Sequence, residues 1–133
     1  MSNAALDTNV LIYLFSNDAP FKRQKVDELL LHSPYIPAQV VSEFLNVSKR
    51  LLALPKRDIL NKCRQVIAHC MIVPTTHQTL QQAEMLIDKY DLQLFDAIVT
   101  AAALDAHCEI LYTEDMHHGL LIENTLRIIN PFI

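Results

Sequence analysis

Apolar residues recur along the chain in two spacings that alternate with each other. Short apolar runs of a few residues are typical of buried strands, and stretches in which apolar residues return every three or four positions indicate helices. The predicted strands are residues 2–6, 35–37, 70–73, 109–113 and 126–129. The predicted helices are a short one after residue 7 and longer ones at 21–32, 38–54, 56–69, about 77–90 and 96–106.

Local signals support these boundaries. Pro20 suits the first position of the helix 21–32, Pro55 separates the next two helices, and Thr75 or Thr76 is placed to cap the helix that ends near Tyr90. Only the alanine-rich first strand has poor β propensity. Short strands alternating with helices predict an α/β fold, namely a single-domain three-layer α/β/α sandwich over residues 1–133 with a short-stranded parallel sheet.

The composition agrees with a globular protein. Of the 133 residues, 51% are hydrophobic and 20% are charged. No apolar run is long enough for a membrane helix and no leader pattern opens the chain, so we expect a cytoplasmic protein without a membrane partner. The three cysteines, Cys63, Cys70 and Cys108, lie in apolar surroundings without zinc-site spacing and are expected to be reduced core thiols.

Two further properties exclude function classes. Phosphate-binding loops and dinucleotide fingerprints need several glycines, and Gly119 is the only glycine in the sequence. The net charge of −4 argues against a protein that is held on nucleic acid by bulk positive charge. A nuclease stays possible, because catalytic acids add negative charge that a bound metal ion offsets.

Four acids follow predicted strands or begin the helices after them. Asp7 lies between two apolar runs, and Glu43 lies near the start of the helix 38–54. Asp96 begins the alanine-rich helix, and Asp115 follows the strand 109–113. In a parallel sheet such positions meet beyond the carboxyl ends of the strands. Carboxylates gathered there repel one another unless a cation lies between them, and all-oxygen ligands favour Mg²⁺ or Mn²⁺.

Each acid also has an ordinary structural interpretation. Asp7 and Asp96 are both placed to cap a helix. Glu43 falls roughly opposite the apolar stripe of its helix, as a solvated glutamate would; the stripe consists of Val41, Phe44, Leu45, Leu51 and Leu52. For the fourth position, Glu114 competes with Asp115 on the residues alone.

Several segments in a fixed order resemble one family. They are LDTNVLI at 6–12, SEF at 42–44, FDA at 95–97 followed by Ala101, YTED at 112–115 and INPF at 129–132. Together they span essentially the whole chain and resemble the PIN domain, a family of metal-dependent ribonucleases that includes the VapC-type toxins of toxin–antitoxin pairs.

The resemblance implies roles for particular residues. It places the metal ligands at Asp7, Glu43, Asp96 and Asp115, and so selects Asp115 over Glu114; it also gives supporting roles to Asn9 and Thr113. The implied cofactor is Mg²⁺ or Mn²⁺. The implied partners are an RNA substrate, a small antitoxin protein and a second copy of the chain.

Other polar and apolar features stay open between two interpretations. His117 and His118, beside the fourth acid, either contact substrate phosphate or belong to a solvated loop. The basic pairs between residues 22 and 64 form either a phosphate-binding rim or solvated helix faces. Val47, Leu51 and Leu54 are candidates for a protein interface.

The leading hypothesis is therefore a divalent-metal-dependent endoribonuclease that hydrolyses RNA phosphodiester bonds as the toxin of a toxin–antitoxin pair. One alternative is a PIN-fold module that binds RNA or protein without catalysis. Another is a metal-dependent phosphohydrolase of small molecules, although no Asp-x-Asp motif surrounds Asp7.

Overall fold

The computed structural model describes residues 3–133, so that residues 1 and 2 of the expected domain lie outside the described residues. Its strands form one sheet in the order β3-β2-β1-β4-β6-β5. The strands are β1 (Ala4–Leu6), β2 (Tyr35–Pro37), β3 (Met71–Val73), β4 (Ile110–Tyr112), β5 (Leu121–Ile122) and β6 (Leu126–Ile129). The neighbours from β3 to β6 pair in parallel and β5 pairs antiparallel with β6.

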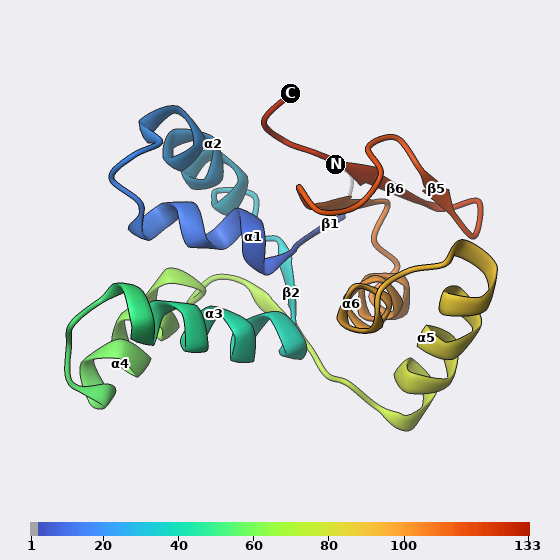
Figure 1. Ribbon diagram of the computed structural model, residues 1–133, viewed down its shortest axis with the longest axis horizontal. Helices are drawn as coiled ribbons and strands as arrows, with labels where there is room; N and C mark the ends of the chain where they lie inside the picture. The colour runs from blue at the N-terminus through green and yellow to red at the C-terminus, as the bar shows by residue number, and fades with distance from the viewer. Residues whose placement is uncertain (1–2) are drawn as a thin grey trace.

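The helices complete an α/β/α arrangement. They are α1 (Thr8–Leu11), continued by the 3₁₀ helix η1 (Ile12–Phe15), α2 (Pro20–Leu30), α3 (Ala38–Leu51), α4 (Lys56–Val66), α5 (His77–Tyr90) and α6 (Leu94–Asp105). In Figure 1, helices α1 to α4 lie on the left of β1 and β2, and α5 and α6 lie on the right. The predicted fold class is confirmed: the sheet is mostly parallel and has helices on both faces.

The first strand forms in spite of its poor propensity. β1 lies between β2 and β4, with Ala5 and Leu6 completely buried. Pairing on both sides supplies the backbone hydrogen bonds that local preference does not favour. The chain leaves this inner strand at Asp7, which fixes the position of the candidate site.

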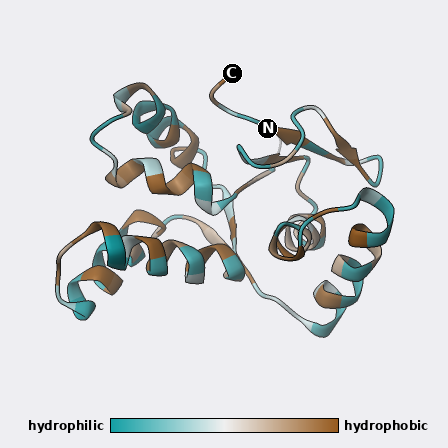
Figure 2. Ribbon diagram, viewed as in Figure 1, coloured by the Kyte–Doolittle hydropathy of each residue, from teal (hydrophilic) through white to brown (hydrophobic). Residues whose placement is uncertain are grey.

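The helices that flank the site pack in different ways. α3 buries Val40 and Phe44 and exposes its other side, so that hydrophobic and hydrophilic stretches alternate along it in Figure 2. The ring of Phe44 stacks on Phe15 with centroids 5.4 Å apart. Leu51, which belongs to the predicted apolar stripe of this helix, is 56% exposed, whereas Leu52 packs against the core, so the prediction is wrong at Leu51. By contrast, α6 is buried from Ala97 to Ala103, as expected for a helix between other layers.

Several boundaries differ from the prediction. β5 was not predicted; it is a two-residue strand that turns back through Glu123 and Asn124, both in the left-handed region with φ of 49° and 62°. Gly119 also has a positive φ of 88°, a conformation that glycine adopts without strain. The helix containing Asp96 begins two residues earlier than predicted, at Leu94.

The expected cap of α5 and the expected free cysteines are both observed. Thr76 caps α5 in a capping box with Thr79, and no disulfide joins Cys63, Cys70 and Cys108. Burial raises the pKa of Cys70 and Cys108 to about 11, which keeps both thiols protonated at neutral pH. Among residues 3–133, every helix is too short or too polar to cross a membrane.

Candidate active site

Asp7 lies where β1 ends and α1 begins. Its backbone N–H donates to the carbonyl of Tyr112 at 3.0 Å, which extends the pairing of β1 with β4 by one residue. Its Oδ1 accepts from the backbone N–H of Thr8 at 2.7 Å, so Asp7 caps the short helix. Only 5% of its surface is exposed. The capping interpretation is therefore correct, but it accounts for one carboxylate oxygen only.

The second oxygen belongs to a network around Thr113, which directly follows β4. The Thr113 hydroxyl donates to Asp7 Oδ2 at 2.9 Å and accepts from Asn9 Nδ2 at 3.0 Å and from the backbone N–H of Asp115 at 3.2 Å. Asn9 Oδ1 in turn accepts from the backbone N–H of Glu114 at 3.0 Å. These bonds fix the start of α1 and the loop after β4 relative to each other.

The ionised form of Asp7 is disfavoured where it lies. Burial, aided by the negative charges of Asp96 and Glu43, raises its pKa from 3.8 to about 6, against the hydrogen bonds from Thr113 and Thr8 that lower it. A buried carboxylate in the field of two others is an environment that a cation would stabilise.

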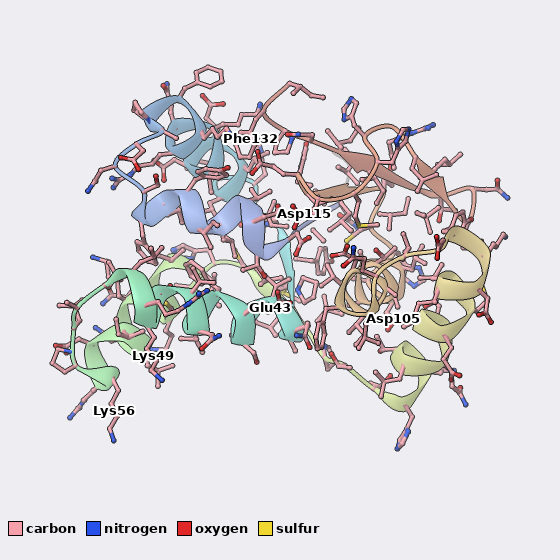
Figure 3. All side chains as sticks on the ribbon, in the orientation of Figure 1. Glu43, Lys49, Lys56, Asp105, Asp115 and Phe132 are labelled. Carbon is pink, nitrogen blue, oxygen red and sulfur yellow. The ribbon has the colours of Figure 1, made fainter. Side chains whose placement is uncertain are left out.

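The other three acids lie around Asp7 on separate elements. Glu43 is half-buried on α3, Asp96 is half-buried in the first turn of α6, and Asp115 is exposed on the loop after β4. Burial raises the pKa of Asp96, and the charges of Asp115 and Glu43 add to the shift. Figure 3 shows Glu43 and Asp115 around the N-terminal end of α1. The four acids are thus linked through their charges.

Asp96 does not cap its helix. The capping position of α6 is Gln93, whose side chain makes no capping hydrogen bond. The carboxylate of Asp96 is therefore not engaged with the start of its own helix, unlike that of Asp7.

A divalent cation fits this donor set. The four carboxylates supply only oxygen donors, which hard cations prefer. The two ion pairs found within residues 3–133 engage Glu114 and Glu123, so neither neutralises the four acids. The buried hydroxyl of Thr8, next to Asp7, makes no hydrogen bond within the described part of the chain. In that same part, no three His, Cys, Asp or Glu side chains already converge on a common metal position, so the side chains must rotate to share an ion.

The hydrogen-bond partners of Glu114 were not predicted from the sequence. Its carboxylate accepts from Tyr13 and Lys22, which are distant in sequence, so it turns away from Asp115. For His117 and His118 a substrate contact and a solvated loop were both open. His118 Nδ1 accepts from the backbone N–H of Asn130 at 2.9 Å, while His117 is exposed.

Comparisons with known proteins agree on the fold. The family model of the PIN domain matches residues 4–118. No curated protein is similar enough to the chain to count as a match.

Solved structures of similar proteins cover nearly the same length. A toxin–antitoxin complex from Klebsiella pneumoniae has 23% identity and a TM-score of 0.73, with 97% of this chain and 98% of that chain covered. VapBC2 of Rickettsia felis, bound to a DNA fragment of its promoter, has 17% identity and a TM-score of 0.68, with coverages of 96% and 98%. VapC20 of Mycobacterium tuberculosis, a toxin that cleaves the sarcin–ricin loop, has 16% identity and a TM-score of 0.67, with coverages of 85% and 90%. At these identities the similarity shows a shared fold.

Proposed function

This chain belongs to the PIN-domain family, and we propose that it is a divalent-metal-dependent endoribonuclease that hydrolyses RNA phosphodiester bonds as the toxin of a toxin–antitoxin pair. The observation that carries the proposal is the clustering of four acids. Asp7 and Asp115 follow the paired parallel strands β1 and β4, and burial together with the charges of neighbouring acids, Glu43 of α3 included, raises the pKa of Asp7 and Asp96. Keeping several carboxylates close together without a lysine or arginine is costly, and a metal site gives that arrangement a purpose.

In this proposal Asp7, Glu43, Asp96 and Asp115 hold Mg²⁺ or Mn²⁺. When bound, such an ion lowers the pKa of a coordinated water molecule and offsets charge that develops on the phosphoryl group. The other residues position the acids. Thr113 fixes Asp7 Oδ2 through its hydroxyl and Asn9 ties the start of α1 to the loop after β4, while Asp115 and Glu43 lie closer to solvent and can adjust.

The distribution of charge supports an RNA substrate. Nine of the eleven lysines and arginines lie between Lys22 and Arg64, together with only four of the fifteen aspartates and glutamates. These basic residues belong to α2, α3 and α4, which lie on the left in Figure 1. In spite of the net negative charge, this side can attract a phosphate backbone to the site. In this proposal His117 and His118, two and three residues after Asp115, contact the phosphate backbone as well.

The proposed partners are a small antitoxin and a second copy of the chain, in the cytoplasm. The Klebsiella pneumoniae structure is a toxin–antitoxin complex. On this chain, Leu51 and Leu54 are exposed where α3 ends, near Val47, and offer apolar surface for a partner.

Replacement of Asp7 tests the proposal. Asp7→Asn keeps the shape of the side chain and removes its charge, so metal-dependent cleavage of a panel of single-stranded RNAs should fall about 100-fold or more, because a catalytic metal contributes several kcal/mol to transition-state stabilisation. Asp88→Asn, at an exposed acid on α5, is the matched control and should cleave like the wild type.

Three outcomes would contradict this function. Unchanged cleavage by Asp7→Asn would exclude the catalytic role of the site. Calorimetry that finds no Mn²⁺ binding dependent on Asp7 and Asp96 would favour a PIN-fold binding module. Release of phosphate from small phosphoesters, with RNA left intact, would favour a phosphohydrolase.

A further inference from the structure

We propose that Glu114, held by Tyr13, Lys22 and Phe132, is a positioning residue that fixes the backbone of Asp115 at the metal site. We name these four residues the site cluster. The inference rests on the proposed function, because it assigns a task within the same site. It concerns residues outside the set of four acids and relies on contacts that join four separate segments of the chain.

Both carboxylate oxygens of Glu114 are engaged. Oε1 accepts from the Tyr13 hydroxyl at 2.6 Å, and Oε2 accepts from the Lys22 ammonium at 2.9 Å. Lys22 also donates to the Tyr13 hydroxyl at 3.0 Å, which closes a triangle of hydrogen bonds. Glu114 can therefore ligate an ion at the site only by breaking these bonds, although it is the direct neighbour of Asp115.

Phe132 completes the site cluster from the other end of the chain. The Lys22 ammonium lies 4.6 Å from the ring centre of Tyr13 and 5.1 Å from that of Phe132. The two rings meet edge to face, with centroids 5.1 Å apart. Figure 3 shows Phe132 beside α2, the helix that carries Lys22. The side chains of Lys22 and Glu114 are only 35% and 22% exposed, so water screens this pair less than a fully exposed one.

The cluster reaches the site through the backbone. The N–H of Glu114 donates to Asn9 Oδ1, and the N–H of Asp115 donates to Thr113 Oγ1. Residue 114 is thus held by its side chain on one side and by its backbone on the other. The Asp115 carboxylate makes no hydrogen bond to any residue in the described range 3–133. Its position therefore depends on the backbone that Glu114 fixes.

A purely structural role is the competing explanation, and the molecule contains a control for it. Lys89, Tyr90 and Glu123, which we name the edge cluster, repeat the same chemistry away from the four acids. Glu123 Oε2 accepts from Lys89 at 2.7 Å and from the Tyr90 hydroxyl at 2.8 Å. If clusters of this kind only stabilise the fold, equal substitutions in both should have equal consequences.

The experiment compares Glu114→Gln with Glu123→Gln in the full-length chain. Both substitutions remove the charge that lysine pairs with. At residue 114 the amide nitrogen of glutamine, which cannot accept a hydrogen bond, also replaces one of two accepting oxygens. At residue 123 the glutamine carbonyl can take the place of Oε2, which accepts both hydrogen bonds. Mn²⁺ alone is titrated into each protein by calorimetry, the melting temperature is recorded without metal, and RNA cleavage is measured over a range of Mn²⁺ concentrations.

We expect Glu114→Gln to weaken Mn²⁺ binding about tenfold and to raise the Mn²⁺ concentration for half-maximal cleavage, because outer residues that orient metal ligands have effects of that size. Glu123→Gln should bind Mn²⁺ and cleave like the wild type, and its melting temperature should fall no more than that of Glu114→Gln. Lys22→Met should reproduce the weaker binding of Glu114→Gln, and Lys22→Arg should restore most of it.

The outcomes separate this inference from the proposed function. Wild-type protein that binds Mn²⁺ and cleaves RNA, together with unchanged Mn²⁺ affinity in Glu114→Gln and Lys22→Met, would overturn the positioning role alone. Equal losses in Glu114→Gln and Glu123→Gln would overturn it too. Wild-type protein that neither binds Mn²⁺ nor cleaves RNA would overturn the proposed function, and the positioning role with it.

Discussion

Glu114 and Glu123 each bind a lysine and a tyrosine, yet the two glutamates restrain different parts of the molecule. Glu114 holds the loop that carries Asp115, whereas Glu123 ties the turn between β5 and β6 to the end of α5. In addition, the backbone N–H of Glu123 donates to the Tyr90 hydroxyl at 2.9 Å. The same chemistry thus serves a loop of the candidate site in one case and an edge of the sheet in the other.

The four acids of the site differ from these two glutamates, because none of the four pairs with a lysine within residues 3–133. Hydrogen bonds from Lys89 and Tyr90 lower the pKa of Glu123, while burial raises that of Asp7 to about 6. Asp7 accepts from a hydroxyl and a backbone N–H, both uncharged donors at 3 Å or less. Lysines therefore neutralise Glu114 and Glu123, which lie outside the set of four acids, and none neutralises the four acids within residues 3–133. This difference is expected if the four acids bind a metal ion.

The largest expected effect concerns the pH dependence of stability in the metal-free protein. Because the pKa of folded Asp7 lies above its ordinary value of 3.8, the folded state retains a proton that the unfolded chain releases. The free energy of unfolding should then fall as the pH rises from about 4 to about 7, with about 3 kcal/mol of the loss due to Asp7.

Urea unfolding across this pH range, compared between the wild type and Asp7→Asn, measures that contribution. The difference between the two curves should shrink on the acid side, where Asp7 is protonated. Glu123→Gln, which retains Asp7, should lose stability between about pH 5 and about pH 7 as the wild type does. Parallel curves for the wild type and Asp7→Asn would contradict the raised pKa and with it the contrast between the two carboxylates.

A smaller effect is expected from Thr113→Val, which removes the hydroxyl shared by Asp7, Asn9 and the Asp115 backbone. Mn²⁺ affinity measured by calorimetry should fall about 10- to 100-fold, and the free energy of unfolding should fall by about 1–3 kcal/mol because buried polar groups lose a partner. Thr79→Val is the matched control: Thr79 is equally buried but donates to Asp105 at the other end of α6.

Thr79→Val should lower stability and leave Mn²⁺ affinity unchanged. If both threonine variants lose Mn²⁺ affinity to the same extent, the effect arises from general loosening of the fold, and the special position of Thr113 is refuted.

The smallest effect is expected from Lys89→Met in the edge cluster. Lys89 is 57% exposed at its side chain, and exposed ion pairs contribute little to stability because water screens them. Chemical denaturation should detect a smaller loss of stability than for Thr113→Val, and RNA cleavage should match the wild type. A clear loss of cleavage would show that the edge of the sheet communicates with the site, and would remove the distinction between the two clusters.

Much of the fold could be predicted because its signals are local. Apolar runs located β2, β3, β4 and β6, and Pro20 and Thr76 marked the starts of two helices. β5 was not predicted, because a segment of two residues shows no periodicity and forms a strand only by pairing with β6. Leu51 was wrongly predicted to be buried. Helical spacing shows which residues share a face of the helix, but it does not show how far the neighbouring elements cover that face.

The site was predictable to a different degree. Asp7 lies at a predicted strand end, and Asp96 lies near a predicted helix start. Asn9 and Thr113, to which the resemblance gave supporting roles, contact each other and the Asp7 carboxylate. The metal-binding role of the four acids stays a prediction. The partners of Glu114 could not be foreseen, because Tyr13 is separated from it by 101 positions and no local pattern reports such a contact.

The antiparallel strand β5 bears on the tendency of the protein to aggregate. Sheet edges present unpaired N–H and carbonyl groups that can recruit a strand from another molecule. At one end of this sheet, β5 is only two residues long and turns away through left-handed residues, which leaves little backbone to template a partner. The opposite edge is β3, where Met71 and Ile72 are 60% and 55% exposed. Intermolecular strand pairing is thereby concentrated at β3, and a charged residue at either of these two positions should improve solubility.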